Sequence, residues 1–157
     1  MVLVDTSVWS LALRRKQTDL SAGEHALREA LGKLIREGRA QIMGPVRQEL
    51  LSGIREDASF RRLRDYLRAF DDPSLRVEDY EETARMNNLC RTRGIAGSPV
   101  DFLICAVAQL RNWPVFTADR AFGRYAKVLS LRLYCGESVD TCSFSIAYAP
   151  PNAPFTR

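Results

Sequence analysis

Four acidic residues stand where a carboxylate could do chemistry. Asp5 ends a short apolar run at the start of the chain, and Asp119 comes one residue after a second apolar segment. Glu49 and Asp101 have apolar neighbours, so each is expected near a core, where a charged carboxylate needs a partner. Oxygen-only ligands of this kind suit Mg²⁺ or Mn²⁺.

Crowding of these acids would call for a cation. If Asp5, Asp101 and Asp119 lie about 5 Å apart, each pair repels by roughly 3 kcal/mol at an effective dielectric of about 20. Three pairs total about 10 kcal/mol, comparable to the whole stability of a domain. Taken singly, Asp5 and Asp119 could be helix N-caps, and Asp101 could be stabilised in the first turn of a helix by its dipole. Glu49 could pair with a surface arginine.

Strands alternating with helices must position these acids. The predicted strands are the segments 2–4, 40–43, 75–77, 114–117 and 128–134. The predicted helices are the segments 8–13, 21–38, 45–53, 60–70, 78–93 and 99–111, with another from 118. This order favours an α/β protein with a parallel sheet covered on both faces. Ligands of such sheets bind at the carboxyl ends of the strands, where Asp5 and Asp119 would point.

Composition bounds the class of protein. The 157 residues suit one domain, and 46% hydrophobic with 27% charged residues excludes a disordered chain or a coiled coil. The longest apolar run, 102–108, is far shorter than the roughly 20 residues of a membrane helix. The N-terminus lacks the pattern of a signal peptide. We therefore expect a cytoplasmic protein with no membrane contact.

Cysteine spacing and charge add weaker indications. The cysteines, at 90, 105, 135 and 142, form no C-x-x-C pair, and His25 is the only histidine, so zinc-ligand spacing is missing. Reduced thiols acting as small core residues are expected. The net charge of +4 includes 20 Arg and only 3 Lys. Arginine suits phosphate recognition, so the composition leans toward an anionic partner.

Each of the four acids lies in a short motif. The motifs are VDTSVW at 4–9, RQELLSG at 47–53, SPVDFLICA at 98–106 and TADRAF at 117–122. In this order and spacing they resemble the four acidic motifs of PIN-domain ribonucleases, and the resemblance covers residues 1 to about 135. The nearest likeness is to the VapC-type toxins of bacterial VapBC toxin-antitoxin pairs, which are stand-alone PIN domains of about this length.

The resemblance implies a fold and a site. It implies a three-layer PIN-like fold at residues 1–135, with a central, mainly parallel sheet of four to five strands flanked by helices. Residues 136–157 have no counterpart and are expected to be an irregular C-terminal extension. By position, Asp5, Asp101 and Asp119 would bind Mg²⁺, or Mn²⁺, with Glu49 as the fourth catalytic acid and Thr117 as a supporting hydroxyl.

The implied function is a metal-dependent endoribonuclease that acts as the toxin of a type II toxin-antitoxin system. Its partners would be an RNA substrate and a cognate antitoxin, in a homodimer or a toxin-antitoxin hetero-oligomer. Arg120 and Arg124 are candidates for neutralising RNA phosphates. Many relatives have a further Asp where this chain has Ala121, so a second metal position would be weaker here.

Other classes of function fit less well. A non-catalytic PIN domain that binds RNA or protein is favoured by Ala121 and disfavoured by the four retained acids. A haloacid-dehalogenase-like phosphatase needs a second Asp at the position of Ser7. A phospho-receiver domain needs an acidic pair at the first strand, which is not evident. With one histidine, a nuclease that uses two histidines as acid and base is excluded.

Overall fold

A short buried strand, β1 (Val2–Val4), forms the centre of the sheet. The computed structural model describes residues 1–135. Within them, β1 pairs in parallel with β2 (Ala40–Gln41) on one side and with β3 (Val115–Phe116) on the other. All three residues of β1 are buried, as expected for a parallel strand covered on both faces by helices. The predicted α/β class is therefore confirmed.

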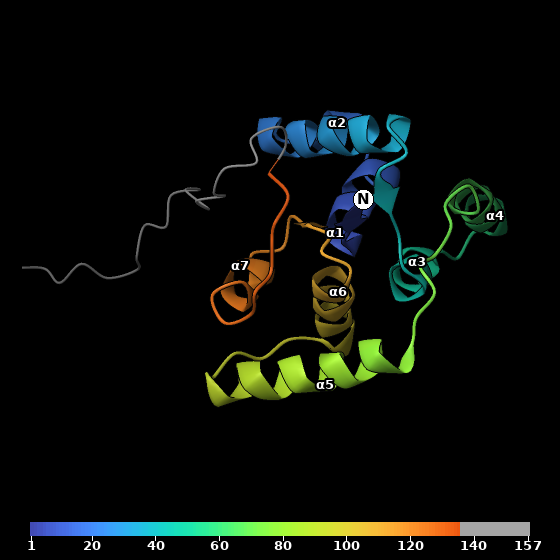
Figure 1. Cartoon of the computed structure of the whole chain (residues 1–157). Coiled ribbons are helices and arrows are strands. Elements are labelled where there is room, and N and C mark those ends of the chain that lie inside the picture. Colours follow the sequence, from blue (N-terminus) through green and yellow to red (C-terminus); the bar gives the residue numbers. More distant parts are fainter. Residues whose placement is uncertain (136–157) are drawn as a thin grey trace, which may run out of the picture.

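Helices cover both faces of this sheet. They are α1 (Thr6–Leu13), α2 (Ala22–Arg36), α3 (Gly44–Leu51), α4 (Asp57–Leu67), α5 (Val77–Thr92), α6 (Pro99–Leu110) and α7 (Ala121–Tyr125), with a 3₁₀ turn at Gln17–Asp19. In Figure 1, α1 and α2 lie on the side opposite to α6 and α5. In the chain, α3 and α4 come after the edge strand β2, and α7 comes after the other edge strand, β3. The result is three layers.

The sheet is smaller than predicted, with three strands in residues 1–135 instead of four to five. The expected strand at 75–77 is absent because α5 begins there, where the carboxylate of Asp79 accepts a hydrogen bond from the backbone before the helix. In the segment 128–134, only Leu133 forms a bridge, parallel to Val115. Helix capping has thus replaced strand pairing at 75–77, whereas in 128–134 the pairing is limited to one bridge.

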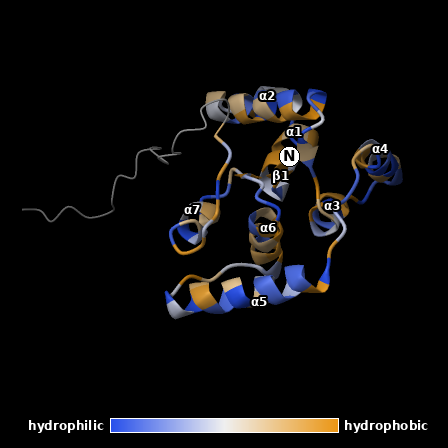
Figure 2. Ribbon diagram, viewed as in Figure 1, coloured by the Kyte–Doolittle hydropathy of each residue, from blue (hydrophilic) through white to orange (hydrophobic). Residues whose placement is uncertain are grey.

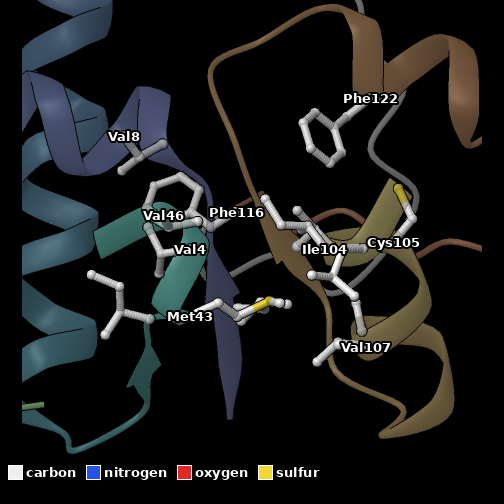
Figure 3. Packing of buried hydrophobic residues seen from close by; sticks show 14 of the residues in the cluster. Val4, Val8, Met43, Val46, Ile104, Cys105, Val107, Phe116 and Phe122 are labelled. Atoms are coloured by element: carbon white, nitrogen blue, oxygen red, sulfur yellow. The ribbon is translucent and has the colours of Figure 1, made fainter. Parts of the chain in front are cut away.

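The core is built around α6, the helix that contains the longest apolar run of the sequence. Seven consecutive residues of this helix, 102–108, are buried. Figure 2 shows α6 as mostly hydrophobic, whereas α5 beside it carries many hydrophilic residues. Figure 3 shows Val4 of β1 and Phe116 of β3 in one cluster with Val8 of α1 and Ile104 of α6. This packing therefore fixes the positions of the carboxyl ends of the strands.

A buried ion pair ties the start of α5 to the end of α6. Asp79 is fully buried, and its carboxylate accepts hydrogen bonds of 2.7 and 3.0 Å from the guanidinium of Arg111. Arg111 also donates to the carbonyl of Ser74 at 2.8 Å. Hydrogen bonding to Arg111 is the main reason why the pKa of Asp79 lies below its ordinary value. In this part of the fold, a buried carboxylate is balanced by an arginine.

The expectation of reduced, buried cysteines is met in part. Cys90 and Cys105 are free and buried, as predicted, but Cys135 is disulfide-bonded, so the expectation of a reduced thiol is wrong for it. Cys142 and the predicted extension at 136–157 lie outside the described residues. No helix in residues 1–135 has the length and apolar character needed to cross a bilayer.

Candidate active site

Asp5 lies at the carboxyl end of β1, where its backbone N–H donates to the carbonyl of Phe116 at 2.9 Å. Its side chain caps α1 by accepting a hydrogen bond from the backbone of Ser7 at 3.3 Å. Two hydroxyls also donate to it, from Ser7 at 2.6 Å and from Thr117 at 2.9 Å. All three bonds end on Oδ2, which leaves Oδ1 available to another partner. Asp5 is therefore an N-cap, as one interpretation held, with more donors than capping requires.

The charge of Asp5 has no cationic partner within residues 1–135. Its side chain is buried, with the residue only 6% exposed, yet the ion pairs of this part of the chain do not include it. Burial raises the pKa of Asp5, against the opposing effect of the hydroxyls of Ser7 and Thr117. Asp79, the other buried acid, has Arg111. Of the two buried carboxylates in residues 1–135, Asp79 therefore has a positively charged partner and Asp5 has none. A bound cation would supply that positive charge to Asp5.

Hydroxyls join the carboxyl ends of β1 and β3. Thr117 is buried, and its Oγ1 accepts a hydrogen bond from the backbone of Asp119 at 2.9 Å while donating to Asp5. The Oγ of Ser7 accepts from the backbone of Ala118 at 2.9 Å. Thr117 therefore contacts both Asp5 and the backbone of Asp119. The sequence interpretation used Ser7 to argue against a phosphatase and did not assign it to the site, although a hydroxyl two residues after a strand-end acid was the available signal.

Asp119 is exposed and lies just before α7. Its Oδ1 accepts a hydrogen bond from the backbone of Ala121 at 2.8 Å. The helix begins at Ala121, after the N-cap residue Arg120, so the predicted start at 118 is wrong. Before the helix, the Asp119 side chain accepts its hydrogen bond from two residues ahead, which is the pattern of a turn and not a helical contact. The side chain of Ala121 is buried in the core, so this position offers no ligand at the surface.

Glu49 reaches the start of α1 from α3. It is exposed, and its Oε2 accepts a hydrogen bond of 2.5 Å from the hydroxyl of Thr6, the residue after Asp5. No arginine pairs with it in the part of the chain that the structure describes, so the alternative of a surface ion pair is not supported. Thr6 is a contact that the sequence interpretation did not assign to the site.

Asp101 is held from two directions. It forms a capping box with Ser98, in which the Asp101 N–H donates to the serine hydroxyl at 3.0 Å and the Ser98 N–H donates to Oδ2 at 3.2 Å. The hydroxyl of Tyr125, on α7, also donates to Oδ2 at 3.0 Å. Burial, reinforced by this hydrogen bond, raises the pKa of Tyr125, so the phenol stays protonated and donates. No motif pointed to Tyr125.

Electrostatic effects connect the acids to one another. The pKa of the buried Cys105 thiol is raised mainly by burial, and the charges of Asp101 and Asp5 both add to this effect. The pKa of Tyr125 responds in the same way to Asp101 and Asp119. Cys105 is therefore within electrostatic range of Asp101 and Asp5, and Tyr125 within that of Asp101 and Asp119.

The acids nevertheless do not form a closed metal cage. Within residues 1–135, no group of three or more His, Cys, Asp or Glu side chains is arranged so that it could hold a metal ion. The close packing considered for Asp5, Asp101 and Asp119 is thus not what the structure has. The physical reason lies in their partners, because Asp101 and Asp119 each bond to the start of their own helix, and like charges gain nothing by approaching.

The donor chemistry still suits a divalent cation. Each acid makes its side-chain hydrogen bonds through one oxygen, which is Oδ2 in Asp5 and Asp101, Oδ1 in Asp119 and Oε2 in Glu49. The second oxygen of each acid remains available. Hard carboxylate oxygens combined with waters are the ligands that Mg²⁺ takes in sites that act on phosphates.

Two arginines lie beside these acids. Arg120 follows Asp119 directly, and Arg124 lies in the last turn of α7. Both are exposed, and neither forms an ion pair with a residue in 1–135. Their positions are compatible with the predicted role in contacting phosphates.

Comparison with known proteins identifies the fold. By sequence, no curated protein matches the chain. Among solved structures, FitAcB from Neisseria gonorrhoeae is similar with a TM-score of 0.67 and 19% identity, covering 86% of this chain and 97% of the other. VapBC2 from Rickettsia felis, bound to a DNA fragment from its promoter, has a TM-score of 0.63 and 14% identity, covering 85% and 98%. A toxin-antitoxin complex from Klebsiella pneumoniae has a TM-score of 0.56 and 17% identity, covering 76% and 88%.

These likenesses agree with the resemblance inferred from the four motifs. At such low identity they show the fold alone. The sequence match to a family is more direct, since the PIN domain profile covers residues 2–128, most of the chain. The protein therefore belongs to the PIN domain family.

Proposed function

We propose that this protein is a metal-dependent endoribonuclease and the toxin of a type II toxin-antitoxin pair. PIN domains are typically nucleases, which supports the class of activity. The observation that carries the proposal is Asp5, a buried carboxylate with an available oxygen and no cationic partner in residues 1–135. Asp101 and Asp119 likewise make their side-chain hydrogen bonds through a single oxygen each.

In this proposal Asp5, Asp101 and Asp119 bind Mg²⁺, which Mn²⁺ could replace. When bound, the ion polarises the scissile phosphate and makes a water more acidic. Ser7 and Thr117 hold Asp5 through Oδ2, so its other oxygen is kept in one orientation. Hydrolysis by water does not require the 2′-hydroxyl of RNA, and we expect products with a 5′-phosphate and a 3′-hydroxyl.

The other site residues act on water and on the substrate. Glu49 is anchored by Thr6 through one oxygen, and its other oxygen orients the attacking water. Arg120 and Arg124, which are exposed beside Asp119, neutralise phosphates of the bound RNA. Because these arginines contact the backbone, they contribute affinity without selecting a sequence.

An antitoxin is the proposed protein partner. The similar structures include FitAB bound to a DNA fragment and a toxin-antitoxin complex from Klebsiella pneumoniae. We expect this chain to form a homodimer or a hetero-oligomer with its antitoxin. An antitoxin arginine could replace the metal by a charge-assisted fork to two carboxylates. Changing that arginine to Ala should then raise the dissociation rate and restore RNA cleavage.

RNA cleavage by the purified protein tests the activity. Asp5→Asn and Asp101→Asn should abolish Mg²⁺-dependent cleavage, and Glu49→Gln should reduce it strongly. Glu29→Gln is the matched control, because Glu29 is exposed on α2 and has no ion pair in residues 1–135. Cleavage at the wild-type rate by Asp5→Asn would refute the assignment.

A non-catalytic PIN domain that binds RNA or protein is the second candidate. It is favoured by Ala121 and by the lack of a closed group of metal ligands in residues 1–135. Calorimetric titration with Mg²⁺ and Mn²⁺ separates the two functions. Absence of metal binding, together with retained binding of RNA, would select the non-catalytic alternative.

A further inference from the structure

Tyr125 contacts the site although it belongs to none of the four acidic motifs. It lies at the end of α7, and its hydroxyl donates a 3.0 Å hydrogen bond to Oδ2 of Asp101 at the start of α6. The two residues are 24 positions apart in the chain. This hydrogen bond connects α7 to α6, two helices that are separated in the chain by β3.

Aromatic packing fixes the ring of Tyr125. The residue is 1% exposed, and its ring centre lies 5.1 Å from that of Phe102 and 5.4 Å from that of Phe122. Phe102 directly follows Asp101, so the first turn of α6 presents a carboxylate to the hydroxyl and a ring to the ring. A tyrosine has only two side-chain torsions, and packing on both sides therefore determines where its hydroxyl lies.

Gly97 provides the space that this hydroxyl occupies. A Cβ atom at position 97 would lie 2.3 Å from the oxygen of Tyr125 and 2.8 Å from the ring carbon that bears it. The backbone of Gly97 does not have the positive φ found at Gly38, Gly53 and Gly94, so its conformation does not require glycine. The requirement is for space alone. The segment before α6 thus carries a residue suited to the close approach of Tyr125.

The second donor changes what Asp101 can do. A capping box alone would allow rotation that exchanges the two carboxylate oxygens, because only the Ser98 N–H holds the side chain. The hydroxyl of Tyr125 approaches from another helix and binds the same oxygen, Oδ2. Exchange would then break two hydrogen bonds. Asp119, in contrast, is exposed and has a single hydrogen bond, from its own helix.

We propose that Tyr125 is a positioning residue that holds Oδ2 of Asp101 and so leaves Oδ1 as the oxygen that binds a divalent cation, with Gly97 leaving room for the hydroxyl. This inference rests on the proposed metal-dependent function. Groups that orient a metal ligand commonly contribute 10- to 100-fold to metal affinity. Tyr125 touches neither substrate nor metal and acts only through Asp101.

Mn²⁺ binding to the purified full chain, measured by calorimetry, tests the role of Tyr125. Tyr125→Phe keeps the ring and removes the hydroxyl, and it should weaken Mn²⁺ binding about 10-fold. Tyr134→Phe is the control, because its ring also packs against a phenylalanine, Phe116 at 5.1 Å, without a hydrogen bond to these acids. It should bind Mn²⁺ like the wild type.

A second measurement separates positioning from damage to the fold. At Mn²⁺ concentrations that are the same multiple of each protein's own dissociation constant, the rise in Tm of Tyr125→Phe should equal that of the wild type. Unchanged Mn²⁺ affinity in Tyr125→Phe, with normal wild-type binding, would overturn the positioning role alone. Failure of the wild type to bind Mn²⁺ would overturn the proposed function and this inference together.

Discussion

Replacing Asp5 with Asn removes a buried charge from the site while keeping the shape of the side chain. The carboxylate has no cationic partner in residues 1–135, and burial raises its pKa. The amide oxygen of Asn can still accept the hydrogen bonds from Ser7 and Thr117. We therefore expect Asp5→Asn to stabilise the metal-free protein at neutral pH while abolishing RNA cleavage.

The gain is a difference between two larger effects. Burying a carboxylate costs several kcal/mol, and hydrogen bonds to the charged form return about 1.5–3 kcal/mol each. Three donors converge on Oδ2 of Asp5, so most of the cost is offset. Because burial outweighs these hydrogen bonds, we expect the Asn variant to be the more stable one, by an amount on the order of 1 kcal/mol, the usual size of a single-residue change in stability. In a domain of this size, each kcal/mol raises the Tm by about 2–4 °C.

The gain should depend on pH. Below the ordinary Asp pKa of 3.8, the carboxyl of Asp5 is protonated in both the folded and the unfolded wild type. In that range its charge makes no difference between the stability of the wild type and that of Asp5→Asn. As the pH rises, the unfolded chain ionises first, and the wild type loses stability until the pH passes the raised pKa of the folded state. The advantage of Asp5→Asn should therefore grow above pH 3.8 and then become constant.

Urea and thermal unfolding in EDTA across this pH range provide the measurement. Asp119→Asn is the control, since Asp119 is exposed and should change stability by less than about 0.5 kcal/mol. With Mn²⁺ at about 100 times its dissociation constant, the wild type should gain about 2.7 kcal/mol and Asp5→Asn very little. A metal-free Asp5→Asn variant that is less stable than the wild type at pH 7 would refute the reasoning.

Three further predictions test other features of the fold and site. Asp79→Asn should destabilise the protein by about 3 kcal/mol in urea unfolding, because it removes the buried partner of the partly exposed guanidinium of Arg111; a loss below about 1 kcal/mol would contradict this. Gly97→Ala should displace Tyr125, lower stability by about 1–3 kcal/mol and weaken Mn²⁺ binding, whereas Gly23→Ala, with open space around it, should be neutral or stabilising in the same assays. RNA cleavage should require Mg²⁺ or Mn²⁺ and be poorly supported by the larger Ca²⁺, so persistent activity in EDTA would argue against a metal-dependent enzyme.

Features that depend on neighbouring residues were predictable from the sequence. The helix predicted at 21–38 is α2, which starts with a capping box of the neighbouring residues Ser21 and Glu24, and the apolar run 102–108 lies in the helix predicted at 99–111, which is α6. Alternating strands and helices indicated the α/β class, and four acidic motifs in order indicated the PIN fold. Such signals need only a few adjacent side chains, so no knowledge of the distant chain is required.

Strand boundaries were less predictable because pairing depends on geometry elsewhere. The segment 128–134 has the composition of a strand, yet a single bridge at Leu133 is all that forms there. The segment 75–77 instead starts α5, where a capping hydrogen bond from the backbone to Asp79 competes with strand pairing. Two segments that were both predicted as strands thus adopt different structures, an isolated bridge in one and the start of a helix in the other.

The sequence by itself determined which acids the protein has and which segments carry them, since type and spacing are local properties. Only the tertiary structure decided which of these acids are buried, which groups they bond to and how they are oriented. Asp5 is buried beside Thr117, 112 positions away, and Glu49 is bonded to Thr6, 43 positions away. Tyr125 reaches Asp101 only because packing brings α7 onto the start of α6. Burial, pairing and orientation of a charge depend on whatever the folded chain places around it, and a linear pattern does not contain that information.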